Sequence, residues 1–394
     1  MTTVYDVTDW IIPGSSVTCY TDIGAVINSM IADIKSQQPS QAAKPGAVIY
    51  IPPGDYSLKT RVTVDVSYLS IRGSGHGFTS LGIRYATSDT SAWHEIWPGG
   101  SHIRVENTDG NVEAFIVTRS GNPRLSSIEF EDFCLDGIAF VPNQNSYVNG
   151  KVGIRFDSAT DSARVNNMGM VFLEHAIVAR DVDAMSITGN FLCECGNAIE
   201  LTSSGQASTV TNNLIGAGNF GYSIFAESHF GLLVSGNNIF PRGKDLVHLK
   251  NCSLSIVTSN RLHNFYAGIV TLEGTCTENL ITANHFYRAT ESTSNGLDDL
   301  FGLVQINGSN NSVTANHFSF AVPPGQITPS GATPTIILVK SGDGNSLATN
   351  HIVAGVSVKT VVLDGSTTNT HILDSGTTAE LQAYSTSYSF RPTP

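Results

Sequence analysis

The stretch Ile187–Phe191 (ITGNF) is the first clear copy of a short pattern: an apolar β-former, one or two small residues, an Asn and a second apolar residue. The Asn residues of the successive copies are Asn190, Asn213, Asn237, Asn260, Asn284, Asn316 and Asn350. Their spacings are 23, 24, 23, 24, 32 and 34 residues. A repeat period in the twenties is typical of a solenoid.

The residue types in each copy indicate what the repeating unit is. β-branched and aromatic residues alternate within a copy, as a strand requires. Helical solenoids need long amphipathic stretches, and none occurs between Asn190 and Asn284. The pattern therefore predicts a single-stranded parallel β-helix with Asn at a fixed corner. Asn suits a corner because it tolerates the left-handed conformation, and stacked amides can bond along the coil.

The composition restricts the partners. The chain has 394 residues, 41% of them hydrophobic and 14% charged, with a formal net charge of −12. This charge argues against nucleic acid or an anionic membrane as a partner. The first residues lack the features of a signal peptide, which predicts a cytoplasmic protein or a secreted one whose signal has been removed. Six cysteines are too few for a disulfide framework, so buried free thiols are expected, including Cys193 and Cys195 on one strand.

The N-terminal region has the features of a cap for the coil. Residues 22–35 form an amphipathic pattern with Asp22 as the expected N-cap, and the apolar stretch Gly46–Tyr56 (GAVIYIPPGDY) follows. This order resembles the start of pectate-lyase-like right-handed β-helices, in which a helix covers the open end. Such a cover is needed because a bare terminal turn exposes both the core and unpaired strand edges.

No linker divides the chain, so one domain is expected over residues 1–394. Two irregular segments, 79–101 and 141–150, are expected to be loop insertions, and residues 357–394 a few last strands and a tail. The first loop carries Trp93. An aromatic residue in such a loop could stack on a sugar or could hold the loop against the coil, and both readings stay open.

Carboxylates are the natural catalysts in this chain, which shows neither a metal-ligand cluster nor a nucleophile motif; no metal or cofactor is predicted. Glycosidic chemistry uses two carboxyl groups, one protonated and one ionised. The candidates are Asp132, Asp136, Glu174, Asp183, Glu194, Glu200, Asp298 and Asp299. For any single one, a solvated position on the coil is the default interpretation. Glu194 stands among apolar neighbours, where a raised pKa would be natural.

Several motifs are together more specific than the repeat. They include Asp22–Ile27 (DIGAVI), Gly75–Phe78 (GHGF), Phe133–Gly137 (FCLDG), Asn145–Tyr147 (NSY), Glu194–Asn197 (ECGN), Phe240–Gly243 (FPRG) and Asn295–Leu300 (NGLDDL). In these motifs the chain resembles the inulin fructotransferase family, which includes the difructose dianhydride III hydrolases. The likeness spans nearly the whole chain.

The resemblance implies a right-handed parallel β-helix that assembles as a homotrimer, with active sites at the subunit interfaces. The catalytic Asp and Glu of the family fall on Asp183 and Glu194. The substrate, inulin or a small fructo-oligosaccharide, reacts at C2 of a fructofuranosyl unit. The residues expected to bind it are His76, Trp93, Asn145, Tyr147, Asn197, Arg242 and Asp298.

The family contains two reactions. A fructotransferase releases a cyclic difructose dianhydride (I or III) from inulin, whereas a hydrolase opens difructose dianhydride III to inulobiose. Phe220 and Phe230 stand where inulin-acting members have acidic residues, which favours the hydrolase, with the fructotransferase as the alternative. A trimeric β-helix that binds carbohydrate without catalysis is the second alternative. A pectate lyase would need calcium-binding Asp clusters and a basic groove, which this acidic chain lacks.

Overall fold

The computed structural model describes residues 3–37, 46–77, 100–121, 124–137, 148–217, 221–240, 245–265, 268–289, 301–321, 333–355 and 357–373. The chain forms two compact units. Unit 1 consists of Met1–Leu201 and Asn213–Gly218, and unit 2 of Thr202–Asn212 and Asn219–Pro394. Each unit is described by itself, and the single domain expected from the sequence stays a prediction.

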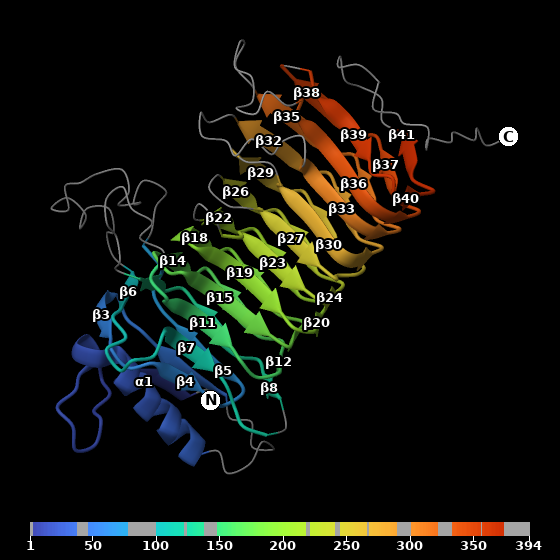
Figure 1. Ribbon diagram of the computed structural model, residues 1–394. Coiled ribbons are helices and arrows are strands. Elements are labelled where there is room, and N and C mark those ends of the chain that lie inside the picture. Colours follow the sequence, from blue (N-terminus) through green and yellow to red (C-terminus); the bar gives the residue numbers. More distant parts are fainter. Residues whose placement is uncertain are drawn as a thin grey trace. The chain divides into compact units, whose positions relative to one another are not determined.

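Unit 1 is a coil of short parallel strands that stack turn upon turn into sheets (Figure 1). Its first sheet has the order β1 (Thr3–Asp6), β2 (Ala47–Tyr50), β5 (Leu69–Arg72), β9 (Glu129–Glu131), β13 (Arg164–Asn166) and β17 (Ser186–Thr188). The second has β3 (Gly54–Leu58), β6 (Ser101–Val105), β10 (Cys134–Asp136), β14 (Gly169–Val171), β18 (Phe191–Cys195) and β22 (Leu214–Ala217).

The third sheet of unit 1 has the order β4 (Val62–Val64), β7 (Glu113–Val117), β11 (Val152–Phe156), β15 (His175–Arg180) and β19 (Asn197–Thr202). A fourth row of two-residue strands follows it: β8 (Leu125–Ser126), β12 (Thr160–Asp161) and β16 (Val182–Asp183). We call this row the rim. Each turn thus crosses the first, second and third sheets and then the rim. The order of these strands fixes where each functional side chain lies.

Unit 2 repeats the same arrangement. Its first sheet is β21 (Thr209–Thr211), β25 (Leu233–Ser235), β28 (Ile256–Thr258), β31 (Leu280–Thr282), β34 (Ser312–Thr314), β37 (Ser346–Ala348) and β41 (His371–Leu373). The second is β26 (Asn238–Phe240), β29 (Arg261–Asn264), β32 (His285–Ala289), β35 (His317–Ala321) and β38 (His351–Ala354). The third is β23 (Ile224–Glu227), β27 (Val247–Lys250), β30 (Val270–Thr277), β33 (Gly302–Ser309), β36 (Thr335–Asp343) and β39 (Lys359–Leu363).

Short strands β20 (Gly205–Gln206) and β24 (His229–Phe230) pair in unit 2, and β40 (Thr367–Thr368) pairs with β36. Strands β39, β40 and β41 lie after residue 357. The parallel register and the repeating turns confirm the predicted right-handed parallel β-helix. In first-sheet strands such as β17, β21 and β28 the middle residue is buried in the core. In the second sheet, Phe286 and Phe318 stack with ring centroids 4.4 Å apart on adjacent turns.

The repeated Asn residues form the predicted ladder. In unit 2, the amide Nδ2 of Asn260 donates to Oδ1 of Asn284 and to the carbonyl of Val234, at 2.9 and 3.0 Å. Oδ1 of Asn260 accepts from both the backbone N and Nδ2 of Asn237, each at 2.9 Å. Asn190 and Asn213 make the same contacts in unit 1. These side chains are almost fully buried, so they satisfy backbone groups that water cannot reach.

One detail of the predicted corner is wrong. The left-handed conformation is adopted by the residue before each ladder Asn, such as Gly189, Ser259 and Ala315, with φ between +54° and +68°. The Asn itself is outside that region. Its side chain is therefore selected for the inter-turn hydrogen bonds, and the small residue before it makes the bend.

Helix α1 (Cys19–Ser36) begins three residues earlier than predicted. Asp22 interrupts it with φ −161°, and its Oδ1 accepts from the backbone N of Gly24 and of Thr60, both at 3.1 Å. Asp22 thus caps the rest of the helix and ties it to the coil. The predicted apolar face, including Ile23 and Ile27, is fully buried. The helix packs on β3 and β4 at the N-terminal end of unit 1, as a cap should (Figure 1).

Candidate active site

Asp183 lies on the rim of unit 1, where β16 pairs with β12. Its Oδ2 accepts a hydrogen bond of 2.7 Å from Nη1 of Arg124, the residue that precedes β8. The Asp183 side chain is 22% exposed and that of Arg124 is 39% exposed. A carboxylate is therefore presented at the molecular surface with a cation fixed beside it.

Glu194 lies in β18 of the second sheet, which comes before the third sheet in each turn, whereas the rim comes after it. The register of β18 with β22 shifts between Cys193 and Cys195, and Glu194 occupies this bulge with φ +52°. The two flanking cysteines are buried, and burial raises the pKa of Cys195 to about 12. Both thiols are therefore buried and inert, as predicted, and Glu194 is the carboxylate of this bulge.

Asn197, which the sequence placed in the site, is near Glu194 in the chain. Its backbone N donates to the carbonyl of Glu174 at 2.7 Å, and its Nδ2 lies 3.4 Å from Nδ1 of His175. Nδ1 of His175 also contacts Glu200. The hydrogen bond to Glu200 raises the pKa of His175, although burial opposes it. Two of the candidate carboxylates, Glu174 and Glu200, thus belong to the same corner as Asn197.

His76 also approaches β18. Its ring stacks on Phe191, with centroids 6.0 Å apart and an interplanar angle of 20°. Burial lowers the pKa of His76, and the charge of Asp132 opposes this. His76 therefore lies beside the first residue of β18, whereas Glu194 and Asn197 lie at the other end of this strand, where the second sheet meets the third. We call this region the β18 corner.

Asp183 is not part of the β18 corner. Strand β15 runs from His175, beside Asn197, to Arg180, and Asp183 follows beyond it on the rim. Six residues of strand span on the order of 20 Å. Figure 1 shows β18 and β12, the partner of β16, at opposite ends of these strands. One chain therefore presents its two predicted catalytic carboxylates at two separate places.

The remaining predicted site residues lie outside the described part of the chain. They are Trp93, Asn145, Tyr147, Arg242 and Asp298. Most of the two predicted loop insertions, 79–101 and 141–150, lies there too, as does Phe220. Among the described residues, no group of three or more His, Cys, Asp and Glu side chains could hold a metal ion. No helix in the described ranges is long and apolar enough to cross a membrane.

The sequence did not single out His102, which bridges two carboxylates of the second sheet. Its Nδ1 contacts Asp55 on β3 at 2.5 Å, and its Nε2 contacts the fully buried Asp136 on β10 at 3.1 Å. Burial lowers the pKa of His102, but the hydrogen bonds and charges of Asp136 and Asp55 outweigh it, and the net pKa is raised. Spacings of 47 and 34 residues give no sequence signal for this bridge.

Replacing His102 by Gln is expected to destabilise the protein most at low pH. A raised folded-state pKa contributes stability that is complete below the ordinary value of 6.5 and is lost as the pH rises through the folded value. Urea unfolding at several pH values measures the difference in unfolding free energy between wild type and variant. We expect this difference to shrink from pH 5.5 to 8.5, whereas replacement of the exposed His371 should change the unfolding free energy little. A difference that grows with pH would contradict the assignment.

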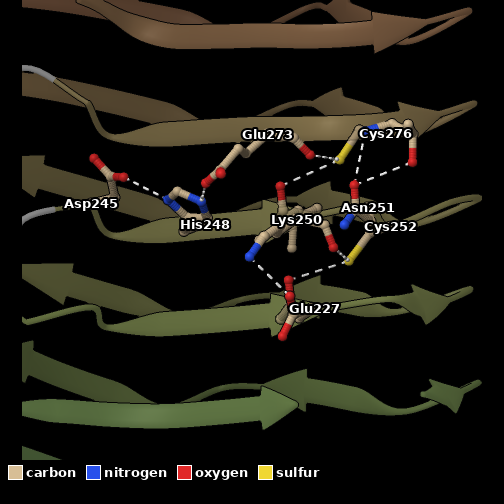
Figure 2. A network of polar contacts seen from close by, with 11 residues as sticks. Glu227, Asp245, His248, Lys250, Asn251, Cys252, Glu273 and Cys276 are labelled. Atoms are coloured by element: carbon tan, nitrogen blue, oxygen red, sulfur yellow. Dashed lines mark hydrogen bonds and ion pairs between the residues drawn. The ribbon is translucent and has the colours of Figure 1, made fainter. Parts of the chain in front are cut away.

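A second histidine bridge lies in the third sheet of unit 2 (Figure 2). His248 on β27 contacts Asp245 at 2.7 Å through Nδ1 and Glu273 on β30 at 2.8 Å through Nε2. Nearby, Lys250 pairs with Glu227 on β23 at 3.0 Å. His248 is buried and both its ring nitrogens are occupied. This network links successive turns of unit 2.

Comparison with known proteins identifies the family of this chain. Residues 283–394 match the family model described as "Beta helix repeat of Inulin fructotransferase", and residues 138–300 match that of "Periplasmic copper-binding protein (NosD)". The chain is 55% identical over 397 residues to the DFA-I-forming inulin fructotransferase of Arthrobacter globiformis, covering 100% of this chain and 99% of that protein. The chain belongs to the inulin fructotransferase family.

Solved structures of this family agree with the fold. DFA-IIIase from Arthrobacter chlorophenolicus A6 without its lid has a TM-score of 0.89 and 48% identity, with 100% of both chains covered. The same enzyme in complex with DFA-III has a TM-score of 0.89 and 45% identity, over 100% of this chain and 99% of that one. The present protein is therefore an enzyme that acts on fructofuranosyl linkages. The family resemblance predicted from the motifs is confirmed.

Proposed function

We propose that the protein is an inulin fructotransferase that releases a cyclic difructose dianhydride, of type I, from the ends of inulin chains. The observation that carries this proposal is the 55% identity to the DFA-I-forming fructotransferase. The DFA-IIIase structures are 44% to 48% identical over equally complete alignments. The sequence alone favoured the hydrolase, whereas the higher identity supports the fructotransferase as the first candidate.

The hydrolase that opens difructose dianhydride III is the second candidate. Two points favour it: the TM-score of 0.89 with a DFA-IIIase bound to DFA-III, and the exposed Phe230, at a position where the resemblance implies an acidic residue in inulin-acting members. An exposed phenyl ring offers no hydrogen bond to the additional sugar hydroxyls of a fructan chain.

The proposed reaction needs two carboxyl groups. A hydroxyl of the terminal fructosyl unit attacks C2 of the fructosyl unit next to it, and the bond from that C2 to the oxygen of the remaining chain breaks. The two units, still joined by their original linkage, leave as the cyclic dianhydride. One carboxylate takes the proton of the attacking hydroxyl, and one carboxylic acid gives a proton to the departing oxygen. No water is consumed. We assign these two tasks to Asp183 and Glu194, with Asn197 binding sugar at the β18 corner and His76 binding it beside the start of β18.

We propose further that each active site is shared between two copies in a homotrimer. Carboxyl pairs that act on one glycosidic bond lie about 5 to 9.5 Å apart. Within one chain, Asp183 and Glu194 are separated by the length of a third-sheet strand, on the order of 20 Å. A rim of one copy that faces the β18 corner of the next copy would bring the two together. Closed cyclic symmetry repeats this contact and yields identical sites.

Incubation with pure substrates tests the reaction. The protein is incubated separately with inulin, with difructose dianhydride III and with difructose dianhydride I, and the products are separated by chromatography. A cyclic disaccharide released from inulin supports the fructotransferase. Inulobiose formed from difructose dianhydride III, with inulin unchanged, would overturn it in favour of the hydrolase. If none of the three substrates changes, the result supports the second alternative, a protein that binds carbohydrate without catalysing a reaction. The Asp183→Asn protein is the blank.

A further inference from the structure

Arg124 is the side chain most closely associated with Asp183 among the contacts that the structure shows. It lies 59 residues away in sequence and reaches across a complete turn of the coil. Besides Nη1 on Asp183, its Nη2 donates to the carbonyl of Thr160 at 3.2 Å and approaches that of Asp181 at 3.5 Å. The guanidinium is thus fixed on two successive turns of the rim. Arginine can make these three contacts at once because its planar guanidinium carries several N–H donors.

The charges around Asp183 show why this cation matters. Asp161 lies beside Asp183 in the paired strands of the rim, and Asp181 lies two residues before it. Arg180 is 3.6 Å from Asp181, and the hydroxyl of Ser162 donates to Asp161 at 3.1 Å. Arg124 is therefore the cation paired with Asp183 within a cluster of three carboxylates. The adjacent guanidinium offsets the mutual repulsion of these like charges.

We propose that Arg124 is a positioning residue that holds Asp183 as the ionised member of the catalytic pair, so that proton donation falls to Glu194. The proposal rests on the proposed function, because it assumes that Asp183 acts in catalysis. A carboxylate that accepts a charge-assisted hydrogen bond from a guanidinium is a proton acceptor and not a donor. Glu194 has two buried, neutral thiols as its chain neighbours.

Two variants separate this role from a structural one. Arg124→Met keeps much of the aliphatic stem and removes the charge, whereas Arg124→Lys keeps the charge and loses the fork. We expect Arg124→Met to lower kcat about tenfold to a hundredfold, as loss of a hydrogen bond to a charged group does, and to move the acidic limb of the pH–rate profile to higher pH. Arg124→Lys should restore the position of that limb and part of kcat.

The matched control is Arg164→Met. Arg164 pairs with Glu129 at 3.0 Å on the first sheet, with 56% of its side chain exposed, and does not belong to the rim. It should leave the pH profile unchanged. Thermal unfolding and gel filtration establish that each variant is folded and assembled as in the wild type.

Three outcomes would overturn the proposal. One is an Arg124→Met profile with its acidic limb in the wild-type position, even if kcat falls, since that is a structural effect. Another is an Arg124→Lys profile shifted as far as that of Arg124→Met. The third is an additive loss on combining Arg124→Met with Asp183→Asn, because a residue that acts through Asp183 has no further effect once Asp183 is neutral. If Asp183→Asn alone keeps full turnover, the catalytic assignment itself fails, which is a separate result.

Discussion

Turnover is expected to fall about 10²- to 10⁴-fold when Asp183 is replaced by Asn, and by a similar factor when Glu194 is replaced by Gln. Each change keeps the shape of the side chain and removes its ability to exchange a proton. Asp183 is on the rim and Glu194 is on a bulge, so neither supports the apolar core. Both variants should therefore unfold at nearly the wild-type temperature.

Steady-state kinetics on the substrate that the wild type converts measures these losses. The matched control is Asp157→Asn, an exposed carboxylate just after β11 in the same unit. It should retain wild-type kcat. Turnover within a few fold of wild type in either Asp183→Asn or Glu194→Gln, with the fold intact, would remove that residue from the mechanism.

Replacement of Asn260 by Ala is expected to lower the free energy of unfolding by at least about 3 kcal/mol. The change removes three hydrogen bonds to buried groups: those with the backbone N and Nδ2 of Asn237 and with the carbonyl of Val234. Each buried polar group left unsatisfied costs roughly 1–3 kcal/mol. The ladder residue is 2% exposed, so water cannot replace the lost bonds without opening the coil.

Urea unfolding of Asn260→Ala and of a control measures this cost. The control is Asn238→Ala, whose side chain is half-buried and accepts one hydrogen bond of 3.3 Å from Arg261. We expect the control to lose less than about 1 kcal/mol. Equal losses in the two variants would show that the ladder does not stabilise the coil beyond an ordinary corner.

The ladder also shows how far the sequence could predict the fold. The period of Asn190, Asn213 and their later copies gave the coil and the inter-turn bonds. A second ladder, Asn279, Asn311 and Asn345, was missed although each member stands five residues before a member of the first. This second repeat has only three Asn residues, because the turn before Asn279 has Ser255 at the equivalent position. The backbone N of Ser255 donates to Asn279.

The site was less accessible to sequence reasoning. Asp183 and Glu194 were chosen through resemblance, since their spacing says only that they are half a turn apart. Arg124 could not have been found, because its contact depends on the register of the rim strands and not on any local pattern. The same holds for His102 and Asp136, which meet only when successive turns stack.

Complementation between two inactive variants tests the shared site most directly. Asp183→Asn and Glu194→Gln chains are co-expressed in equal amounts, with wild-type chains and each single variant prepared in the same way. If each site takes Asp183 from one copy and Glu194 from the next, random assembly leaves about one quarter of the sites with both groups intact. We predict that the mixed preparation regains about a quarter of the wild-type activity. Activity no higher than that of the separate variants would show that no site is formed between copies.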